Sequence, residues 1–173
     1  MKKISISIKQ TKEIAGILAR KILRLRSGRG AVIVGLSGEL GSGKTTFSQC
    51  FARALGIKEK IHSPTFVIFR KHEIRNPKSL PADASHQAMQ AGETNSKSKN
   101  QKFKTLYHFD VYRIKKPKEI IDLGWRKIIS DSKNIILVEW PEKIKKIFPK
   151  KHFWINFTHL APKKRGIDIY LHK

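Results

Sequence analysis

One glycine-rich stretch constrains this chain more than any other feature. Residues 38–49 read GELGSGKTTFSQ and directly follow the apolar run AVIVGLS. Gly38, Gly43, Lys44 and Thr45 match the pattern G-x-x-x-x-G-K-[ST], which a chain of this composition contains by chance in about one case in a hundred. The run before the loop predicts a buried strand, and the apolar spacing after it predicts a helix. Strand, glycine loop and helix in this order are typical of a phosphate-binding loop.

The residue types of this loop suit a nucleotide phosphate. Glycines, with Gly41 as an additional one, let successive N–H groups turn towards phosphate oxygens, and the following helix points its positive end at the same anion. Lys44 can reach the β- and γ-phosphates, and the Thr45 hydroxyl can ligate Mg²⁺. The loop therefore predicts a nucleotide-binding site that uses Mg²⁺.

A phosphate-binding loop needs an acidic group for the metal or its water, usually where another buried strand ends. The run IILVE places Glu139 in that position, and HFDVYR offers Asp110 as a second candidate. Each acid also has a structural interpretation. Glu139 could be a solvated strand end, and Asp110 could be an ion-pair partner of Arg113. The residues alone leave these alternatives open.

Strands that alternate with helices predict one α/β domain over residues 1–173, with a P-loop NTPase-like, mainly parallel sheet flanked by helices. An edge strand is expected in 1–10, and buried or partly buried strands in 31–38, 65–74, 105–114 and 134–140. A closing hairpin, with its strands antiparallel, is expected from 152–160 and 166–172. Helices are expected in 11–27, from the loop to Gly56, in 116–130 and in 141–148.

Residues 76–102 differ in composition from the rest of the chain. They contain almost no large apolar side chain and cannot bury enough surface to offset the entropy of ordering. Strand-like patterning resumes directly after them. We therefore predict a flexible insertion between two strands.

The charge balance points to polyanionic partners without naming one. The chain has 37 Lys and Arg against 13 Asp and Glu, a net charge of +24, which attracts RNA, DNA and nucleotides. The excess is spread over the chain, so a lysine-rich composition of every solvated face explains it equally well. The single cysteine, Cys50, excludes an internal disulfide, and no apolar run approaches the roughly 20 residues of a membrane span. These features predict a soluble, cytoplasmic protein.

Histidines and tryptophans give weaker signals. His62 and His108 lie far apart without a third ligand at a suitable spacing, so they are interpreted as hydrogen-bonding or surface residues and not as metal ligands. Trp140 follows Glu139 and is interpreted as a core residue in preference to one that packs beneath a nucleotide. Trp125 and Trp154 are interpreted as core or interface residues.

Four segments in the order GELGSGKTTF, SPTF, HFDVYR and VEWPEKI resemble the TsaE family, formerly YjeE, of small P-loop ATPases in bacterial tRNA modification. The resemblance covers nearly the whole chain outside the insertion. It implies an ATPase that works with the TsaB and TsaD proteins in forming N6-threonylcarbamoyladenosine beside the anticodon of tRNAs reading codons that begin with A. It implies that this ATPase does not itself transfer the threonylcarbamoyl group, and that it contacts tRNA indirectly or through basic faces.

The resemblance also assigns roles to residues of this chain. Thr45 and Glu139 would coordinate Mg²⁺, and Lys44, Glu139 and Asp110 would be the catalytic groups. The phosphates of ATP would be held at Gly38 and by the loop residues Glu39, Leu40, Gly41, Ser42, Gly43, Lys44, Thr45 and Thr46.

Further roles follow from the other matched segments. Two segments would be switches that sense the nucleotide, one made of Ser63, Pro64, Thr65 and Phe66, and one that contains His108, Asp110, Tyr112 and Arg113. Thr11 matches a family threonine near the adenine, and Arg165 corresponds to a basic residue there. The insertion between the two switches, and Trp125 in EIIDLGWRKII, depart from the family pattern.

Two other classes of function remain as alternatives. A small-molecule kinase is the first, because P-loops serve phosphoryl transfer as readily as hydrolysis. It would need an acceptor pocket and a lid, and the composition of residues 76–102 does not favour a lid. A non-enzymatic RNA-binding module is the second, but no RNA-recognition signature accompanies the positive charge.

Overall fold

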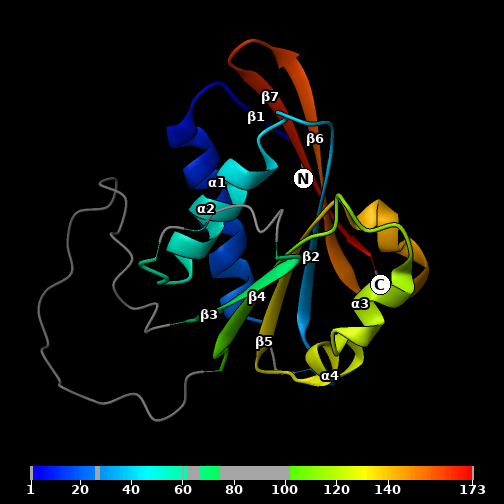
Figure 1. Ribbon diagram of the computed structural model, residues 1–173. Coiled ribbons are helices and arrows are strands. Elements are labelled where there is room, and N and C mark those ends of the chain that lie inside the picture. Colours follow the sequence, from blue (N-terminus) through cyan, green and yellow to red (C-terminus); the bar gives the residue numbers. More distant parts are fainter. Residues whose placement is uncertain (1, 26–27, 60, 62–66, 75–101, 173) are drawn as a thin grey trace, which may run out of the picture.

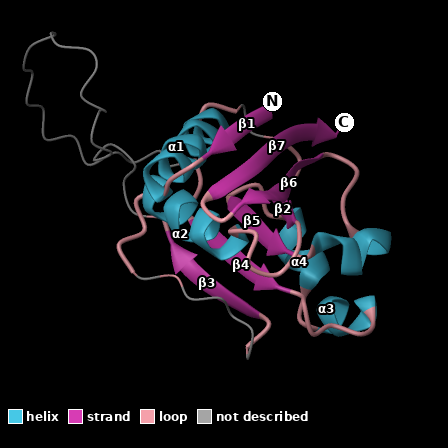
Figure 2. Ribbon diagram, turned by 90° about the horizontal axis from the view of Figure 1, so that it is seen from above, coloured by secondary structure: helices cyan, strands magenta, loops and turns pink. Residues whose placement is uncertain are grey.

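The computed structural model describes residues 2–25, 28–59, 61, 67–74 and 102–172, and within these residues seven strands form one mixed sheet. The strands are β1 (Lys2–Ser5), β2 (Val32–Ser37), β3 (Phe69–Glu73), β4 (Thr105–Asp110), β5 (Asn134–Glu139), β6 (His152–Ala161) and β7 (Lys164–His172). Helices cover both faces of the sheet (Figure 1, Figure 2). They are α1 (Ile8–Leu23), α2 (Lys44–Ala54), α3 (Pro117–Asp122), α4 (Trp125–Ser130) and the 3-10 helix η2 (Pro141–Ile147).

The sheet has a parallel centre and antiparallel edges. Its strand order is β1-β7-β6-β2-β5-β4-β3, in which β6, β2, β5 and β4 run parallel to one another. The hairpin of β6 and β7 is antiparallel, as are the pairs of β1 with β7 and of β3 with β4. The predicted fold class is therefore confirmed, including the antiparallel hairpin at the end of the chain.

Side chains alternate between two apolar layers along the central strands. Ile135 and Leu137 of β5 belong to the cluster that α1 and α2 cover, whereas Ile136 and Val138 belong to the cluster that α3, α4 and η2 cover. This is the period of two that a strand imposes. Glu139 is next in the first series, so its side chain lies on the α2 side of the sheet.

The first helix starts earlier than the apolar spacing predicts. Ser7 caps α1 by accepting a hydrogen bond from the backbone N–H of Gln10 at 3.2 Å, so the helix begins at Ile8 and β1 ends at Ser5. The predicted edge strand is thus confirmed but shorter than residues 1–10. A hydroxyl cap accounts for the boundary, since it satisfies a backbone donor at the helix start.

The single helix predicted over 116–130 is wrong, because the structure has two short helices there. Gly124 lies between α3 and α4 with φ of +84°, a left-handed conformation that stops the first helix and starts the second. The break turns Trp125 into the core, where it is 1% exposed and donates its indole N–H to the Ile147 carbonyl at 3.2 Å.

The strand predicted over 65–74 is described from Phe69, as the antiparallel edge strand β3. Residues 75–101, and hence most of the predicted insertion, lie outside the described residues, so its flexibility stays a prediction. The described residues on either side of it lie next to each other, since the backbone N–H of Ile74 donates to the Lys104 carbonyl at 2.9 Å. Among the residues that the structure describes, no helix combines the length and apolarity needed to cross a bilayer.

Candidate nucleotide site

The glycine loop connects β2 to α2 and passes close to β6. Gly38 has φ of +144°, and a Cβ atom there would lie 2.5 Å from the Phe157 carbonyl oxygen, so only glycine fits. Gly43 caps α2, whose first turn contains no acidic side chain. The positive end of α2 therefore faces the loop without a carboxylate of its own helix to neutralise it.

A cavity of about 410 Å³ lies between this loop and the ends of β4 and β5. It gathers loop residues with both predicted acids and with residues of the second switch segment. Its lining is Leu40, Gly41, Gly43, Lys44, Thr45, Thr46, Asp110, Tyr112, Arg113, Glu139 and Trp140. The fold thus unites groups that lie up to 100 residues apart in the sequence.

The Lys44 ammonium already has four partners beside this cavity, one of which is the Ser42 hydroxyl at 3.5 Å. Nζ donates to the carbonyl oxygens of Gly38 at 2.7 Å and Glu39 at 2.8 Å, and it lies 3.8 Å from the ring centroid of Trp140. Burial lowers the pKa of Lys44, and the nearby carboxylates of Glu139, Glu142 and Asp110 partly offset this. The Lys44 side chain therefore contacts the backbone of its own loop.

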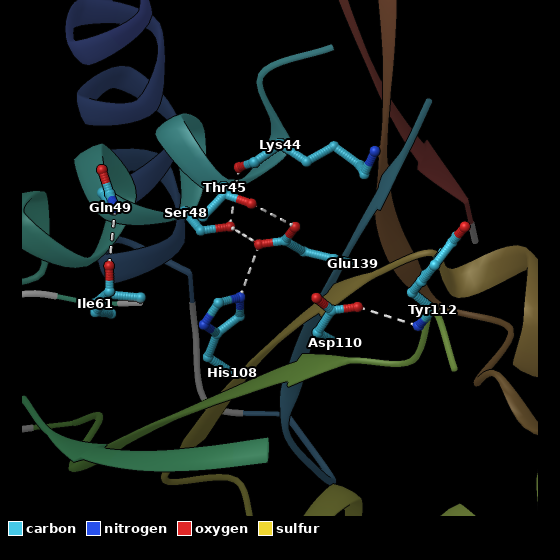
Figure 3. Close-up of polar contacts among 9 residues, drawn as sticks. All are labelled: Lys44, Thr45, Ser48, Gln49, Ile61, His108, Asp110, Tyr112 and Glu139. Atoms are coloured by element: carbon cyan, nitrogen blue, oxygen red, sulfur yellow. Dashed lines mark hydrogen bonds and ion pairs between the residues drawn. The ribbon is translucent and has the colours of Figure 1, made fainter. Parts of the chain in front are cut away.

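Glu139 is the centre of a buried hydrogen-bond network (Figure 3). Thr45 Oγ1 donates to its Oε2 at 3.0 Å, while Ser48 Oγ at 2.8 Å and His108 Nε2 at 2.9 Å contact its Oε1. Glu139 is 2% exposed, so its interpretation as a solvated strand end is wrong. His108 is fully buried and hydrogen-bonded, as expected of a hydrogen-bonding residue and not of a surface residue.

The residues present fit a magnesium ion that binds together with phosphates. The Thr45 hydroxyl and the Glu139 carboxylate are oxygen donors in contact at the cavity, and Mg²⁺ prefers one or two carboxylates supplemented by phosphates and water. Within the described ranges, no three His, Cys, Asp or Glu side chains gather closely enough to hold a metal ion by themselves. The donor set therefore suits a metal held jointly with a nucleotide.

Asp110 ends β4 directly beside Glu139, because the two residues are partners in the parallel register of β4 and β5. Its Oδ1 accepts a hydrogen bond from the backbone N–H of Tyr112 at 3.0 Å. The Tyr112 ring lies 4.9 Å from the Trp140 ring, and both rings line the cavity. The acid, the tyrosine and the tryptophan together form the wall opposite the loop.

A second cavity, of about 440 Å³, lies on the other side of the loop. It shares Gly41, Gly43 and Thr46 with the first, and it brings Thr11 of α1 next to Arg165 of β7. The remaining lining residues are Ser5, Ile6, Ser7, Ile8, Ser42, Phe157, Lys163 and Ile167. Thr11 and Arg165, which the resemblance assigns to the adenine, thus line one cavity that continues from the phosphate loop.

Sequence reasoning missed two residues of the site. Ser48 is fully buried against Glu139, and its spacing of three from Thr45 on a helix places both hydroxyls on one face. Trp140, interpreted as core, is partly buried against the second apolar cluster, but its ring lies over Lys44. The residues Ser63, Pro64, Thr65 and Phe66 of the first switch, and His62, lie outside the described residues.

Comparison with known proteins gives one consistent family. The family model of the threonylcarbamoyl adenosine biosynthesis protein TsaE matches residues 6–87 and 93–167. The TsaE protein of Rickettsia prowazekii is 30% identical over 165 residues, which are 95% of this chain and 90% of that protein. The TsaE protein of Bacillus subtilis is 31% identical over 137 residues, which are 79% of this chain and 68% of that protein.

A solved structure shares the fold. The crystal structure of Bacillus subtilis YdiB superposes with a TM-score of 0.64 and 24% identity, and the match covers 99% of this chain and 84% of that one. The residues that the family model matches include the loop, both acids and the tryptophan beside Lys44. The chain therefore belongs to the TsaE family.

Proposed function

We propose that this chain is a Mg²⁺-dependent ATPase that acts with the TsaB and TsaD proteins in the biosynthesis of threonylcarbamoyladenosine in tRNA. The observation that carries the proposal is the single cavity in which Lys44, Thr45, Asp110 and Glu139 meet at the end of a glycine loop. The pathway follows from the family, whose curated relatives carry the name tRNA threonylcarbamoyladenosine biosynthesis protein TsaE.

The loop would bind the triphosphate. Its residues from Glu39 to Thr46 would offer backbone N–H groups at the positive end of α2, and Lys44 would turn from its carbonyl partners to the β- and γ-phosphates. Thr11 and Arg165 line the cavity on the far side of the loop, where the adenine and ribose would lie.

Glu139 and Asp110 would have different roles in hydrolysis. Thr45 and Glu139 would hold Mg²⁺, which when bound neutralises charge that develops on the phosphates. Asp110, beside Glu139 at the cavity wall, would orient the water that attacks the γ-phosphate. Bond cleavage between the β- and γ-phosphates would give ADP and inorganic phosphate without a covalent enzyme intermediate.

Hydrolysis would drive or reset an assembly with TsaB and TsaD, while the transfer of the threonylcarbamoyl group would belong to the partners. The residues Ser63–Phe66 and His108–Arg113 would sense the nucleotide state. His108 supports this for the second segment, since it contacts the same carboxylate as Thr45. The assembly would act in the cytoplasm, where tRNA would be contacted indirectly or through basic faces.

The direct test is ATP turnover with and without the cognate TsaB and TsaD. We expect slow hydrolysis by the chain alone and faster hydrolysis with both partners. Lys44→Ala should bind ATP about 10- to 100-fold more weakly, since it loses a charge-assisted hydrogen bond worth about 1.5–3 kcal/mol. Lys118→Ala is the matched control, because Lys118 is exposed and pairs with Asp122 outside the cavity.

Two results would overturn the proposal. Lys44→Ala could hydrolyse ATP as well as the wild type when the partners are present. Alternatively, ADP release could depend on a small-molecule acceptor and not on TsaB and TsaD, which would identify a kinase.

A further inference from the structure

We infer that Ser48 and His108 are positioning residues that fix one oxygen of Glu139, so that the other oxygen is directed to Mg²⁺. This inference rests on the proposed Mg²⁺-ATP site and adds two residues to it, of which Ser48 lies outside the phosphate-loop pattern. The two oxygens of Glu139 differ in their partners. Oε1 contacts Ser48 at 2.8 Å and His108 at 2.9 Å, whereas the partner of Oε2 among the described residues is the Thr45 hydroxyl, at 3.0 Å.

The donors on Oε1 are rigidly held. Ser48 and His108 are fully buried, and Glu139 is 2% exposed, so water does not compete for these bonds. Ser48 lies in the middle of α2 and His108 in the middle of β4. Two elements of the fold therefore clamp Oε1 from different directions.

The proton arrangement on His108 agrees with this role. A carboxylate oxygen accepts hydrogen bonds, so in this contact the imidazole donates to Oε1 from Nε2. The other ring nitrogen, Nδ1, is buried and has no hydrogen-bond partner among the described residues. The described hydrogen bond of the ring is therefore the one to Glu139.

The partner of Oε2 is itself a predicted metal ligand. A bound Mg²⁺ would draw on the oxygen lone pairs of Thr45 and of Oε2, and the 3.0 Å hydrogen bond between these two groups would then be given up. The Ser48 hydroxyl has one proton, which it shares between Oε1 at 2.8 Å and the Lys44 carbonyl oxygen at 3.0 Å, and the contact with Oε1 is the shorter. Neither Ser48 nor His108 is a predicted metal ligand, so their contacts with Oε1 can persist while Oε2 changes partner.

The test separates metal coordination from nucleotide binding. The dissociation constant of the non-hydrolysable analogue AMPPNP is measured by calorimetry in excess EDTA and in excess Mg²⁺, and the ratio of the two constants reports the contribution of the metal. For Ser48→Ala we expect an unchanged constant in EDTA and a ratio about 10- to 100-fold smaller than in the wild type, the loss usual for partners of metal ligands. His108→Leu should behave in the same way, and His108→Gln, which retains an N–H donor, should restore most of the ratio.

Two further variants make the result specific. His72→Leu is the matched control, because His72 is also buried and also bonds a carboxylate, that of Glu59 at 3.1 Å, but it lines neither cavity. Its ratio should equal that of the wild type. In a Glu139→Gln background, Ser48→Ala should cause no further loss, since it acts through Glu139.

The outcomes distinguish the inference from the proposed function. If Mg²⁺ does not strengthen AMPPNP binding by the wild type, the proposed function is wrong. If it does, and Ser48→Ala keeps the wild-type ratio or still reduces the ratio in the Glu139→Gln background, the positioning role is wrong. Equal weakening in EDTA and in Mg²⁺ would also overturn it, because that result indicates a general structural defect.

Discussion

Trp140 owes its position to an uncommon backbone conformation. Its φ is +65°, which few non-glycine residues adopt, and this turn directly after β5 brings the indole over the Lys44 ammonium. A left-handed non-glycine residue costs about 1–2 kcal/mol. The cation–π contact with Lys44 and the packing against Tyr112 offset that cost.

The same geometry makes Trp140 a reporter of nucleotide binding. When Lys44 moves to phosphates, the indole loses a cation from its face, so we expect the intrinsic fluorescence to change on addition of Mg²⁺-ATP. Trp125 and Trp154 line neither cavity and should contribute no change. Titration of a Trp140→Phe variant checks this, with Trp154→Phe as the matched control. A nucleotide-dependent signal that persists in Trp140→Phe would contradict the assignment.

Among the elements, the break between α3 and α4 depends most on a single residue. Gly124 is left-handed at φ of +84°, and a Cβ atom there would have no neighbour within 4 Å. Gly124→Ala should therefore lower the free energy of unfolding by about 1–2 kcal/mol, solely through backbone conformation. Urea denaturation monitored by circular dichroism measures this change, and AMPPNP affinity should remain at the wild-type value.

Gly28 provides the matched glycine control. A Cβ atom at Gly28 would also meet open space, but its φ lies outside the left-handed range. Gly28→Ala should leave stability unchanged or raise it by up to about 1 kcal/mol, because it restricts the unfolded chain. An equal loss of stability in both variants would refute the conformational explanation.

The sequence best predicted those elements whose conformation depends mainly on their own residues. The apolar run before Gly38 and the spacing after Lys44 predicted β2, the loop and α2, since local chemistry alone specifies them. The break at Gly124 was missed because a glycine inside an apolar helical pattern is compatible with a continuous helix. Local patterns also do not reveal which residue contacts Glu139, and Ser48 became evident only once α2 was packed against β5.

For the whole molecule, the register of β3 and β4 bears on the role of residues 76–101. Glu73 pairs with Thr105, and Ile74 donates to the Lys104 carbonyl, so a short turn can join the two strands. Replacing residues 76–101 by a short Gly- and Asn-containing turn should preserve the fold and the AMPPNP affinity. Shortening the connection should raise the free energy of unfolding by about 1 kcal/mol through loop-closure entropy. Thermal and urea unfolding check this, and a less stable protein would show that the removed residues pack on the described body.

The chain has a net charge of +24, and in the part that the structure describes exposed basic residues lie on both sides of the sheet. Exposed basic residues occur on α1, as Lys9 and Arg20, and on the opposite side of the sheet on η2, as Lys145 and Lys146. Such a distribution attracts a polyanion from every direction and weakens as ionic strength rises. It favours encounter with polyanions without defining where they dock.

The partners of Lys44 in the structure have a consequence for which anions the site accepts. An incoming anion must draw the ammonium away from the Gly38 and Glu39 carbonyls and from the Trp140 ring before it gains that charge. A free phosphate or sulfate would offer little in exchange, whereas a nucleotide bound as proposed would also fill the cavity lined by Thr11 and Arg165. The loop would thereby discriminate by ligand size, and we expect the abundant small anions of a cell to compete poorly for it.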